Sequence, residues 1–568
     1  MPSRIGDALR WYATYTPSKT AIISAEGEQS YAQLWSRVRR LANSLSRIGI
    51  NPGDRIALLL QNSGRYLELY QAAALLGVAV VPLNFRFVAS EVEYVVNHSG
   101  AKALVFDWAF MPTVDGLRDK LESIGGNYIV TDGDGGPRVH SYERLVEAGL
   151  DVDPTSPADL DACYFQGYTS GTTGFPKGCV NPHREFADCL RRMATIYGIT
   201  PDDTEFVAAP LFHEAPALFA LLQLFRGGTV VVTGDSTPAN VFSLIDKHKA
   251  TWTFMVPTMW AMMVTSEDID RFDLGSLHSV ISGGSPLLTH TKEALIKRLP
   301  DAGLNEFYGG TEVGLVTNLG PADQGRKVRS VGKPVIGMFV ELRDEGGQSV
   351  AQGEIGEIHI GGATLIREYF NNPQATASAR SGTFFTLGDM GRFDEEGFLY
   401  IVDRKKDMII SGGENIFPND IEDVLYKHPA VHMAAVVGAG PHLGRDRRGR
   451  RGEEVRPFRQ RGRSHRSLQR GAVEFQGTEA GRFPRATADV VFRKNTQTRG
   501  AWPLLEGAER TNLEIQIEGS TLFRTKQDAS ASSGLTVLLI VIAVRAATGF
   551  VPMHLWRRIG CSIRNGKS

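Results

Sequence analysis

The chain has 568 residues, more than one hydrophobic core usually organises, so two or more domains are expected. Apolar residues make up 42% and charged residues 22%, an ordinary globular composition that excludes wholesale disorder, a disulfide-rich miniprotein and a collagen-like chain. The net charge of −1 averages two different segments. Residues 1–440 carry 38 Lys and Arg against 52 Asp and Glu (net −14), whereas residues 441–568 carry 24 against 11 (net +13).

Cysteine content and apolar runs bear on the cellular location. Cys163, Cys179, Cys189 and Cys561 form no Cys-x-x-Cys pair, which favours a reducing compartment without structural zinc or a disulfide framework. The first residues lack the long apolar segment of a signal peptide. The longest late apolar run, Leu535 to Val544, is about half of the ~20 residues that cross a bilayer. These features predict a cytoplasmic protein without a transmembrane span.

Short β-branched runs alternate with amphipathic helical patterns from about residue 20 to residue 440. Strands are predicted at 54–60, 78–83, 103–107, 206–209 and 228–233. Helices are predicted at 31–48 and 66–76. Such alternation is typical of parallel sheets with helical crossovers. At 330–402, strands separated by glycines and acidic turns predict a small antiparallel or barrel-like element.

The most informative segment is Tyr168 to Gly178, which reads YTSGTTGFPKG. Its glycines let backbone N–H groups approach phosphate oxygens, its hydroxyls add donors, and Lys177 adds positive charge. The spacing differs from the P-loop, because two residues separate Gly174 from Lys177. A polar turn is the alternative interpretation, but so ordered a string rarely occurs by chance. The segment therefore predicts phosphate binding.

This string resembles the phosphate loop of the adenylate-forming (AMP-binding) superfamily, which includes acyl-CoA synthetases, aryl-CoA ligases, luciferases and peptide-synthetase adenylation domains. Further family-like motifs follow in the family's order at 210–213, 282–286, 308–312, 386–389, 403–407 and 411–416. The element at 386–389 departs slightly from the family's T-G-D, because Leu387 is an extra residue. The resemblance covers about residues 5–443.

The resemblance implies an α/β fold. Residues 1–402 would form a large N-terminal domain of doubly wound αβ subdomains plus a small β-barrel. Residues 403–443 would form the hinge and the start of a small α+β C-terminal domain, which is incomplete here. Residues 444–568 would be an atypical basic tail, frameshifted and poorly ordered.

The resemblance also assigns roles to single residues. Tyr308 would stack on adenine, Thr311 would meet the α-phosphate, and Glu312 would hold magnesium and be the metal ligand. The catalytic residues would be His213 at the carboxylate pocket, Thr311, Glu312, Lys177 and Lys406. Nucleotide would be bound by Thr169, Ser170, Gly171, Thr172, Thr173, Gly174, Lys177, Gly283, Gly284, Ser285, Tyr308, Gly309, Gly310, Thr311, Asp389 and Arg404.

Each of these residues also has a structural interpretation. An isolated histidine such as His213 is often a satisfied core residue, and Lys406 lies in a charge run that is usually a solvated face. Glu312 alone could be an acid at a helix N-terminus, and Asp389 could be a turn residue. The ordered set of motifs favours the site.

The family's catalytic lysine, which follows a glycine near the end of the small domain, has no counterpart here. Lys494 is preceded by Phe-Arg and not by glycine. A hypothesis is that the reading frame slips near Gly444. Residues 445–452 and 468–480 can both be written in codons that, read one base out of frame, encode family-like sequence, and the frame shift is the same for both segments. The alternative is a basic arm for nucleic acid or anionic membrane, but residues 441–500 contain 15 Arg and only one Lys.

The predicted function is an ATP-dependent acyl-CoA synthetase that converts a carboxylic acid, most simply a medium- or long-chain fatty acid, through an acyl-adenylate into a CoA thioester. ATP, Mg²⁺ and coenzyme A are the implied cofactors and substrates, and a small-molecule acid rather than nucleic acid is the implied partner. Alternatives are an aryl (4-coumarate-type) CoA ligase, an adenylation domain that loads a carrier protein, and an inactive nucleotide-binding paralogue.

Overall fold

The computed structural model describes residues 4–154, 159–169, 175–411, 414–418, 421–422, 431–438, 491–492, 514–517, 520–524 and 537–544. The chain divides into two compact units, residues 1–405 and residues 406–568.

The first sheet of the first unit has seven strands in the order β7-β6-β5-β3-β4-β8-β9. They are β3 (Arg55–Leu59), β4 (Ala79–Pro82), β5 (Ala103–Phe106), β6 (Tyr128–Val130), β7 (His140–Ser141), β8 (Cys163–Thr169) and β9 (Lys177–Pro182). Neighbouring strands run parallel except β8 and β9, which form an antiparallel hairpin. The strands predicted at 54–60, 78–83 and 103–107 are β3, β4 and β5.

The second sheet has nine strands in the order β16-β15-β14-β13-β12-β10-β11-β1-β2. They are β1 (Thr20–Ser24), β2 (Gly27–Ser30), β10 (Thr204–Val207), β11 (Thr229–Val232), β12 (Trp252–Met255), β13 (Ser279–Gly283), β14 (Gly303–Gly310), β15 (Gly314–Leu319) and β16 (Lys333–Pro334). The six neighbouring strands β14, β13, β12, β10, β11 and β1 pair in parallel. At one end of the sheet β2 pairs antiparallel with β1, and at the other end β15 and β16 add antiparallel strands.

Helices cover and separate the two sheets. The α-helices of the first unit are α1 (Ile5–Tyr15), α2 (Tyr31–Arg47), α3 (Gly64–Leu76), α4 (Ala89–Ser99), α5 (Met111–Asp115), α6 (Tyr142–Ala148), α7 (His183–Tyr197), α8 (Glu214–Arg226), α9 (Pro238–His248), α10 (Pro257–Thr265), α11 (Thr289–Arg298) and α12 (Pro373–Ala379). Short 3₁₀ turns lie at Trp108–Phe110, Arg118–Lys120, Glu122–Ile124, Glu267–Arg271 and Pro321–Asp323. The helix α3 shows why these segments are helical: Ser63 accepts a hydrogen bond from the Tyr66 backbone N–H, and Gly77 ends the helix with φ 76°.

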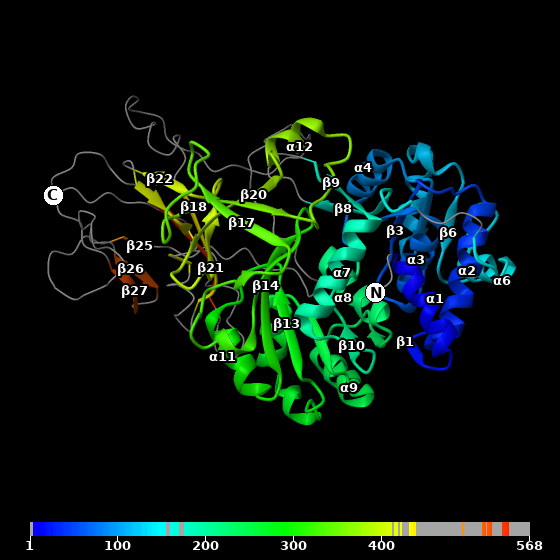
Figure 1. The fold of residues 1–568 in the computed structure, drawn as a ribbon, viewed down its shortest axis with the longest axis horizontal. Helices are drawn as coiled ribbons and strands as arrows, with labels where there is room; N and C mark the ends of the chain where they lie inside the picture. The colour runs from blue at the N-terminus through cyan, green and yellow to red at the C-terminus, as the bar shows by residue number, and fades with distance from the viewer. Residues whose placement is uncertain are drawn as a thin grey trace, which may run out of the picture. The chain divides into compact units, whose positions relative to one another are not determined.

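The main core lies between the two sheets, where α3 and α8 are buried around almost their whole circumference. Figure 1 shows α7 and α8 in this central position, between the blue strands of the first sheet and the green strands of the second. Alternate residues of a strand enter different cores, so that Ile56 and Leu58 of β3 face the central core whereas Ala57 and Leu59 face the outer one. Strands buried on both faces are typical of doubly wound sheets, as the alternation in the sequence predicts.

The remaining strands of the first unit form a five-stranded antiparallel sheet, which is the small curled element expected at 330–402. Its strands are β17 (Met338–Arg343), β18 (Gly356–Gly362), β19 (Arg380–Ser381), β20 (Phe384–Phe393) and β21 (Leu399–Arg404). In the second unit the described strands are β22 (Ile409–Ser411), β23 (Glu414–Ile416), β24 (Val431–Gly438), β25 (Val491–Phe492), β26 (Glu514–Ile517), β27 (Ser520–Arg524) and β28 (Val537–Val544). Most of the late apolar run is thus strand β28, and none of the helices within the described residues has the length and apolar character to span a bilayer.

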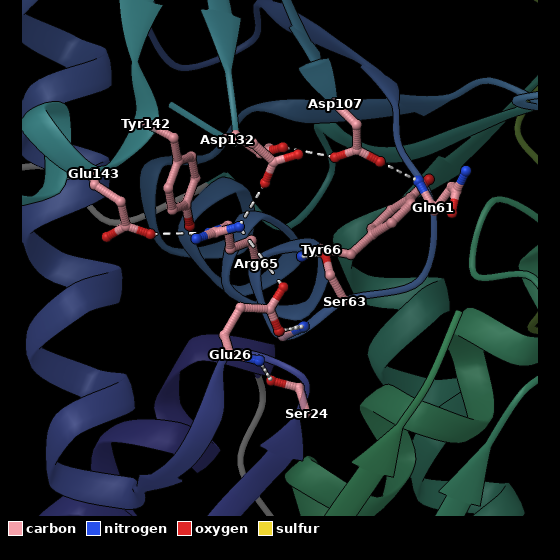
Figure 2. A network of polar contacts seen from close by, with 12 residues as sticks. Ser24, Glu26, Gln61, Ser63, Arg65, Tyr66, Asp107, Asp132, Tyr142 and Glu143 are labelled. Atoms are coloured by element: carbon pink, nitrogen blue, oxygen red, sulfur yellow. Dashed lines mark hydrogen bonds and ion pairs between the residues drawn. The ribbon is translucent and has the colours of Figure 1, made fainter. Parts of the chain in front are cut away.

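A polar network ties the N-terminal elements together. Figure 2 shows Arg65, in the first turn of α3, between Asp132, Glu143 and Glu26. The guanidinium lies 2.9 Å from Asp132 and from Glu143, and 3.7 Å from Glu26. Asp132 follows β6, Glu143 lies in the first turn of α6, and Glu26 lies in the turn between β1 and β2. The Arg65 side chain therefore holds three segments that are separate in the sequence.

Candidate functional site

Segments from all three sheets of the first unit meet at the candidate site. Thr169 ends β8 and pairs across the hairpin with Lys177, the first residue of β9. Thr311 and Glu312 lie in the turn between β14 and β15 of the second sheet. The two sheets approach closely here, since a Cβ atom on Gly167 would lie 3.1 Å from Cγ2 of Thr311.

Glu312 is held through one of its two carboxylate oxygens. The Thr169 hydroxyl donates to Oε1 at 3.1 Å, and the Tyr369 hydroxyl donates to the same oxygen at 3.0 Å. No residue within the described ranges donates a hydrogen bond to Oε2. Within the part of the chain that the structure describes, the half-buried Glu312 is therefore anchored through one oxygen, Oε1.

Lys177 is placed by the same tyrosine. Its Nζ lies 4.1 Å from the centroid of the Tyr369 ring, within the range of a cation–π contact. Tyr369 belongs to a segment between β18 and α12 that runs beside β9, where Arg367 donates its backbone N–H to the Val180 carbonyl and Tyr369 bridges Cys179. Ile366 also donates its backbone N–H to the Glu312 carbonyl at 2.9 Å. This segment thus connects Lys177 with Glu312.

A second polar cluster lies between β14 and the antiparallel sheet. The Tyr308 hydroxyl donates to Oδ2 of Asp389 at 2.7 Å. Arg404 pairs with Asp389 across β20 and β21, with Nε 3.3 Å from Oδ1. Burial, followed by the charge of Asp389, raises the pKa of Tyr308 well above its usual range, so the phenol stays a hydrogen-bond donor. Asp389 itself is buried, whereas 58% of the Arg404 side chain is exposed.

Glycines allow the backbone to come close at two points of the site. A side chain on Gly283, at the end of β13, would collide with the Phe307 ring, and one on Gly309 would collide with the Gly314 backbone. Gly284 has φ +87°, a conformation that favours glycine. Ser285 follows on an exposed loop, and Gly310 ends β14 beside Leu387. The extra residue in the 386–389 element therefore packs against the strand that carries the candidate phosphate-binding residues.

His213 is the N-cap of α8, and its ring lies 4.3 Å from the Phe212 ring. Surrounding protein atoms, and then the Arg86 guanidinium, lower the pKa of His213 to about 4, although the residue is exposed to solvent. The imidazole is therefore neutral at physiological pH. The next residue, Glu214, is buried close to Thr311 and Glu312. Burial, with Glu312 nearby, raises the pKa of Glu214 well above its usual range.

The structure therefore brings Thr169, Lys177, Thr311 and Glu312 together in one cluster, and Tyr308, Asp389 and Arg404 in another. Ser170, Gly171, Thr172, Thr173 and Gly174, together with the expected lysine region around Lys494, lie outside the described residues. Lys406 is exposed and belongs to the second unit, so its role stays a prediction. Sequence reasoning missed Tyr369 and Glu214, because a lone tyrosine or a glutamate at a helix start carries no local signal for this site.

Known proteins are similar to this chain over most of its length. The AMP-binding enzyme family matches residues 9–370 of the chain. The chain is 35% identical to a feruloyl-CoA synthase from Amycolatopsis over 75% of its own length and 84% of that protein. It is also 35% identical to the long-chain-fatty-acid–CoA ligase FadD13 of Mycobacterium tuberculosis, over 76% of this chain and 85% of that one.

A solved relative extends the similarity to the fold. The o-succinylbenzoate CoA synthetase of Bacillus subtilis, in complex with its acyl-adenylate intermediate, superposes with a TM-score of 0.68 at 29% identity. The superposition covers 78% of this chain and 86% of that chain. By family match, by relatives and by fold, this chain belongs to the AMP-binding enzyme family and is an AMP-forming acid–CoA ligase.

Proposed function

We propose that the two clusters form the adenylation site of this ligase. A carboxylate is a poor acyl donor, and its attack on the α-phosphate of ATP gives an acyl-adenylate and pyrophosphate. Such in-line displacements depend on positioning and on charge neutralisation more than on covalent chemistry. The single observation that carries the proposal is the meeting of Thr169 and Lys177, which are paired in the β8–β9 hairpin, with Glu312 from the turn between β14 and β15.

The residues of the first cluster suit the triphosphate. Lys177 supplies the positive charge, and Thr169 and Thr311 supply hydroxyl donors. Glu312 fits a magnesium ion, since its Oε2 is a hard anionic oxygen and Mg²⁺ in nucleotide sites commonly takes one or two carboxylates together with phosphate oxygens. When bound, the ion would neutralise the developing phosphate charge.

The second cluster suits the nucleoside. Asp389 can accept hydrogen bonds from both ribose hydroxyls, with Arg404 beside it, and Tyr308 offers a ring for adenine. The neutral His213 at the start of α8 would face the acid without adding a second charge, so it would donate or accept a hydrogen bond rather than form an ion pair. These roles for Tyr308, Asp389, Arg404 and His213 are proposals that binding measurements can test one by one.

A medium- or long-chain fatty acid is the first candidate substrate, and an aryl acid is the second. The long-chain-fatty-acid ligase and the feruloyl-CoA synthase are equally similar to this chain, at 35% identity. Phe85 and Phe212 form an edge-to-face aromatic pair next to His213, and such an apolar surface suits either class. A panel of octanoate, palmitate and ferulate, ranked by kcat/KM, decides between the two classes.

The basic tail, residues 444–568, bears on whether this chain can catalyse adenylate formation at the rate of an intact ligase. The +13 segment stands where the family's small domain and catalytic lysine are expected, and we propose that a frame slip near Gly444 produced it. Translating the gene in all three frames tests this: a family-like segment at the shifted offset supports the slip, and its absence refutes it. The chain as it stands would then bind ATP and acid while forming adenylate slowly.

The experiment for the function combines binding with turnover. Titration calorimetry should show ATP binding that strengthens with Mg²⁺ and is lost in Asp389→Ala, while Asp161→Ala, an exposed acid away from the site, serves as the control. Exchange of labelled pyrophosphate into ATP should be acid-dependent but slow. Absence of ATP binding would refute the proposed function, and exchange as fast as in an intact relative would refute only the impairment.

A further inference from the structure

We propose that Tyr369 is a positioning residue that fixes the orientation of Glu312 for a divalent cation and the position of Lys177 for phosphate. The inference rests on the proposed function, because it gives Glu312 and Lys177 their ligands. It assigns a role to a side chain outside the motifs that point to nucleotide binding in the sequence.

The first observation is how Tyr369 contacts the two residues. Its hydroxyl donates to Oε1 of Glu312 at 3.0 Å, and its ring lies 4.1 Å from Nζ of Lys177. One side chain therefore uses its polar end for the anion and its ring face for the cation. The two contacts use different parts of the side chain, so the hydroxyl can be removed while the ring is kept.

The second observation is that Tyr369 is itself rigidly held. Only 4% of the residue is exposed, and its ring lies 5.9 Å from the Phe385 ring in the antiparallel sheet. Its backbone N–H donates to the Thr376 hydroxyl at 3.0 Å, and neighbouring residues pair with β9. A side chain fixed in this way costs little entropy when it orients another group.

The third observation is how the hydrogen bonds are distributed over the two oxygens of the Glu312 carboxylate. Tyr369 and Thr169 both donate to Oε1, and no residue in the described ranges donates to Oε2. Two hydrogen bonds to one oxygen fix the carboxylate plane and leave the other oxygen for a ligand. This is the arrangement expected of a carboxylate that binds a cation through one oxygen with the help of supporting hydrogen bonds.

The test uses two substitutions of Tyr369 in the full chain, with ATP binding measured by calorimetry at increasing Mg²⁺. Tyr369→Phe keeps the ring and removes the hydroxyl, so the Mg²⁺ concentration for half-maximal ATP binding should rise about three- to tenfold, as loss of one hydrogen bond implies. ATP affinity without Mg²⁺ should stay unchanged. Tyr369→Leu also removes the ring, so it should weaken ATP binding without Mg²⁺ as well.

The chain offers a matched control in Tyr142, a buried tyrosine whose hydroxyl donates to the buried Glu68 at 2.6 Å in the N-terminal network. Tyr142→Phe removes the same kind of hydrogen bond and should lower thermal stability without changing the Mg²⁺ dependence. A Tyr369→Phe protein with the Mg²⁺ dependence of the wild type would overturn the inference alone. Wild-type ATP binding with no Mg²⁺ dependence would overturn the proposed cation site, and the inference with it.

Discussion

Glu68 and Glu312, two glutamates of the first unit, each accept a hydrogen bond from a tyrosine hydroxyl. They differ in whether one or both of their carboxylate oxygens accept hydrogen bonds from the described residues. Glu68 is fully buried, and both of its oxygens are occupied: Arg37 donates to each oxygen, Gln29 to Oε1 and Tyr142 to Oε2, at 2.6 to 3.1 Å. Among the described residues, the donors to the Glu312 carboxylate are the hydroxyls of Thr169 and Tyr369, and both reach Oε1. A carboxylate with every lone pair used holds structure together, whereas one with a supported and an open oxygen can take a ligand.

The groups that surround Glu68 also differ in charge from those that surround Glu312. The N-terminal network of Figure 2 continues from Glu143, which pairs with both Arg37 and Arg65, to Asp132 and Glu26. Glu143, Asp132 and Glu26 each lie beside a guanidinium, whereas Asp107 accepts from the Gln61 backbone N–H and the Thr131 hydroxyl. Glu312 accepts from the neutral hydroxyls of Thr169 and Tyr369 with the buried Glu214 nearby, and Lys177 contacts the Tyr369 ring instead of the carboxylate. Glu143, Asp132 and Glu26 are thus paired with guanidinium groups, whereas Lys177 and Glu312 are not paired with each other.

The largest expected effect is on stability at Glu68. Glu68→Ala leaves the half-buried Arg37 without its main partner, and breaking a buried ion pair in this way costs about 3–5 kcal/mol of unfolding free energy. Chemical denaturation measures the loss. Arg184→Ala is the control, because its pair with Asp161 is more than half exposed and should contribute less than about 1 kcal/mol. A change below about 1 kcal/mol in Glu68→Ala would contradict the structural role.

The next effect concerns ligand binding at Glu312. Glu312→Gln keeps an amide oxygen that can accept from Thr169 and Tyr369, so unfolding free energy should change by less than about 1 kcal/mol. The charge for the cation is lost, so ATP affinity at saturating Mg²⁺ should fall about tenfold or more, which corresponds to about 1.4 kcal/mol per factor of ten. Calorimetry and thermal unfolding on one sample measure both quantities. A large loss of stability with unchanged affinity would reverse the roles assigned to the two glutamates.

This contrast marks the limit of what the sequence can predict. The β-branched runs at β3, β4 and β5 and the helical patterns of α2 and α3 predict the doubly wound sheets, because strand and helix periodicity are local properties. Ordered motifs likewise point to Thr169, Lys177, Glu312 and Asp389 by resemblance to the family.

Contacts between distant segments could not be predicted. Tyr369 reaches Glu312 because its segment runs along β9, and Glu214 lies near Thr311 because the fold brings the start of α8 close to the turn between β14 and β15. Neither residue differs locally from an ordinary tyrosine or helix-start glutamate. A lone histidine such as His213 is more often a core residue, the ordered motifs favour the site instead, and the fold shows that it is exposed next to Phe212.

A further effect, which depends on pH, concerns the buried His183. Burial is the main cause that lowers the pKa of His183 to about 4, and only 3% of this residue is exposed. Because the native state resists protonation, stability should fall as the pH drops from about 6.5 to about 4, by up to about 3 kcal/mol.

His183→Gln should remove that part of the pH dependence, which denaturation at pH 7 and pH 4.5 measures as a difference from the wild type. The pKa of His213 is lowered in the same direction, so His213→Gln should also remove part of the pH dependence. A pH dependence of stability that is unchanged in His183→Gln would contradict the lowered pKa of the buried histidine.

The smallest effect is expected at Arg404. Its pair with Asp389 is 58% exposed on the arginine side, so Arg404→Ala should change unfolding free energy by only about 0–1 kcal/mol. Asp389 keeps the Tyr308 hydroxyl at 2.7 Å and stays in place, so AMP affinity should fall only a few-fold, by loss of one contact near the ribose. Calorimetry with AMP measures this, and Asp389→Ala gives the upper limit. A stability loss above about 2 kcal/mol would instead place Arg404 with Arg37, among the arginines that hold the fold together, because only a structural ion pair costs that much when it is broken.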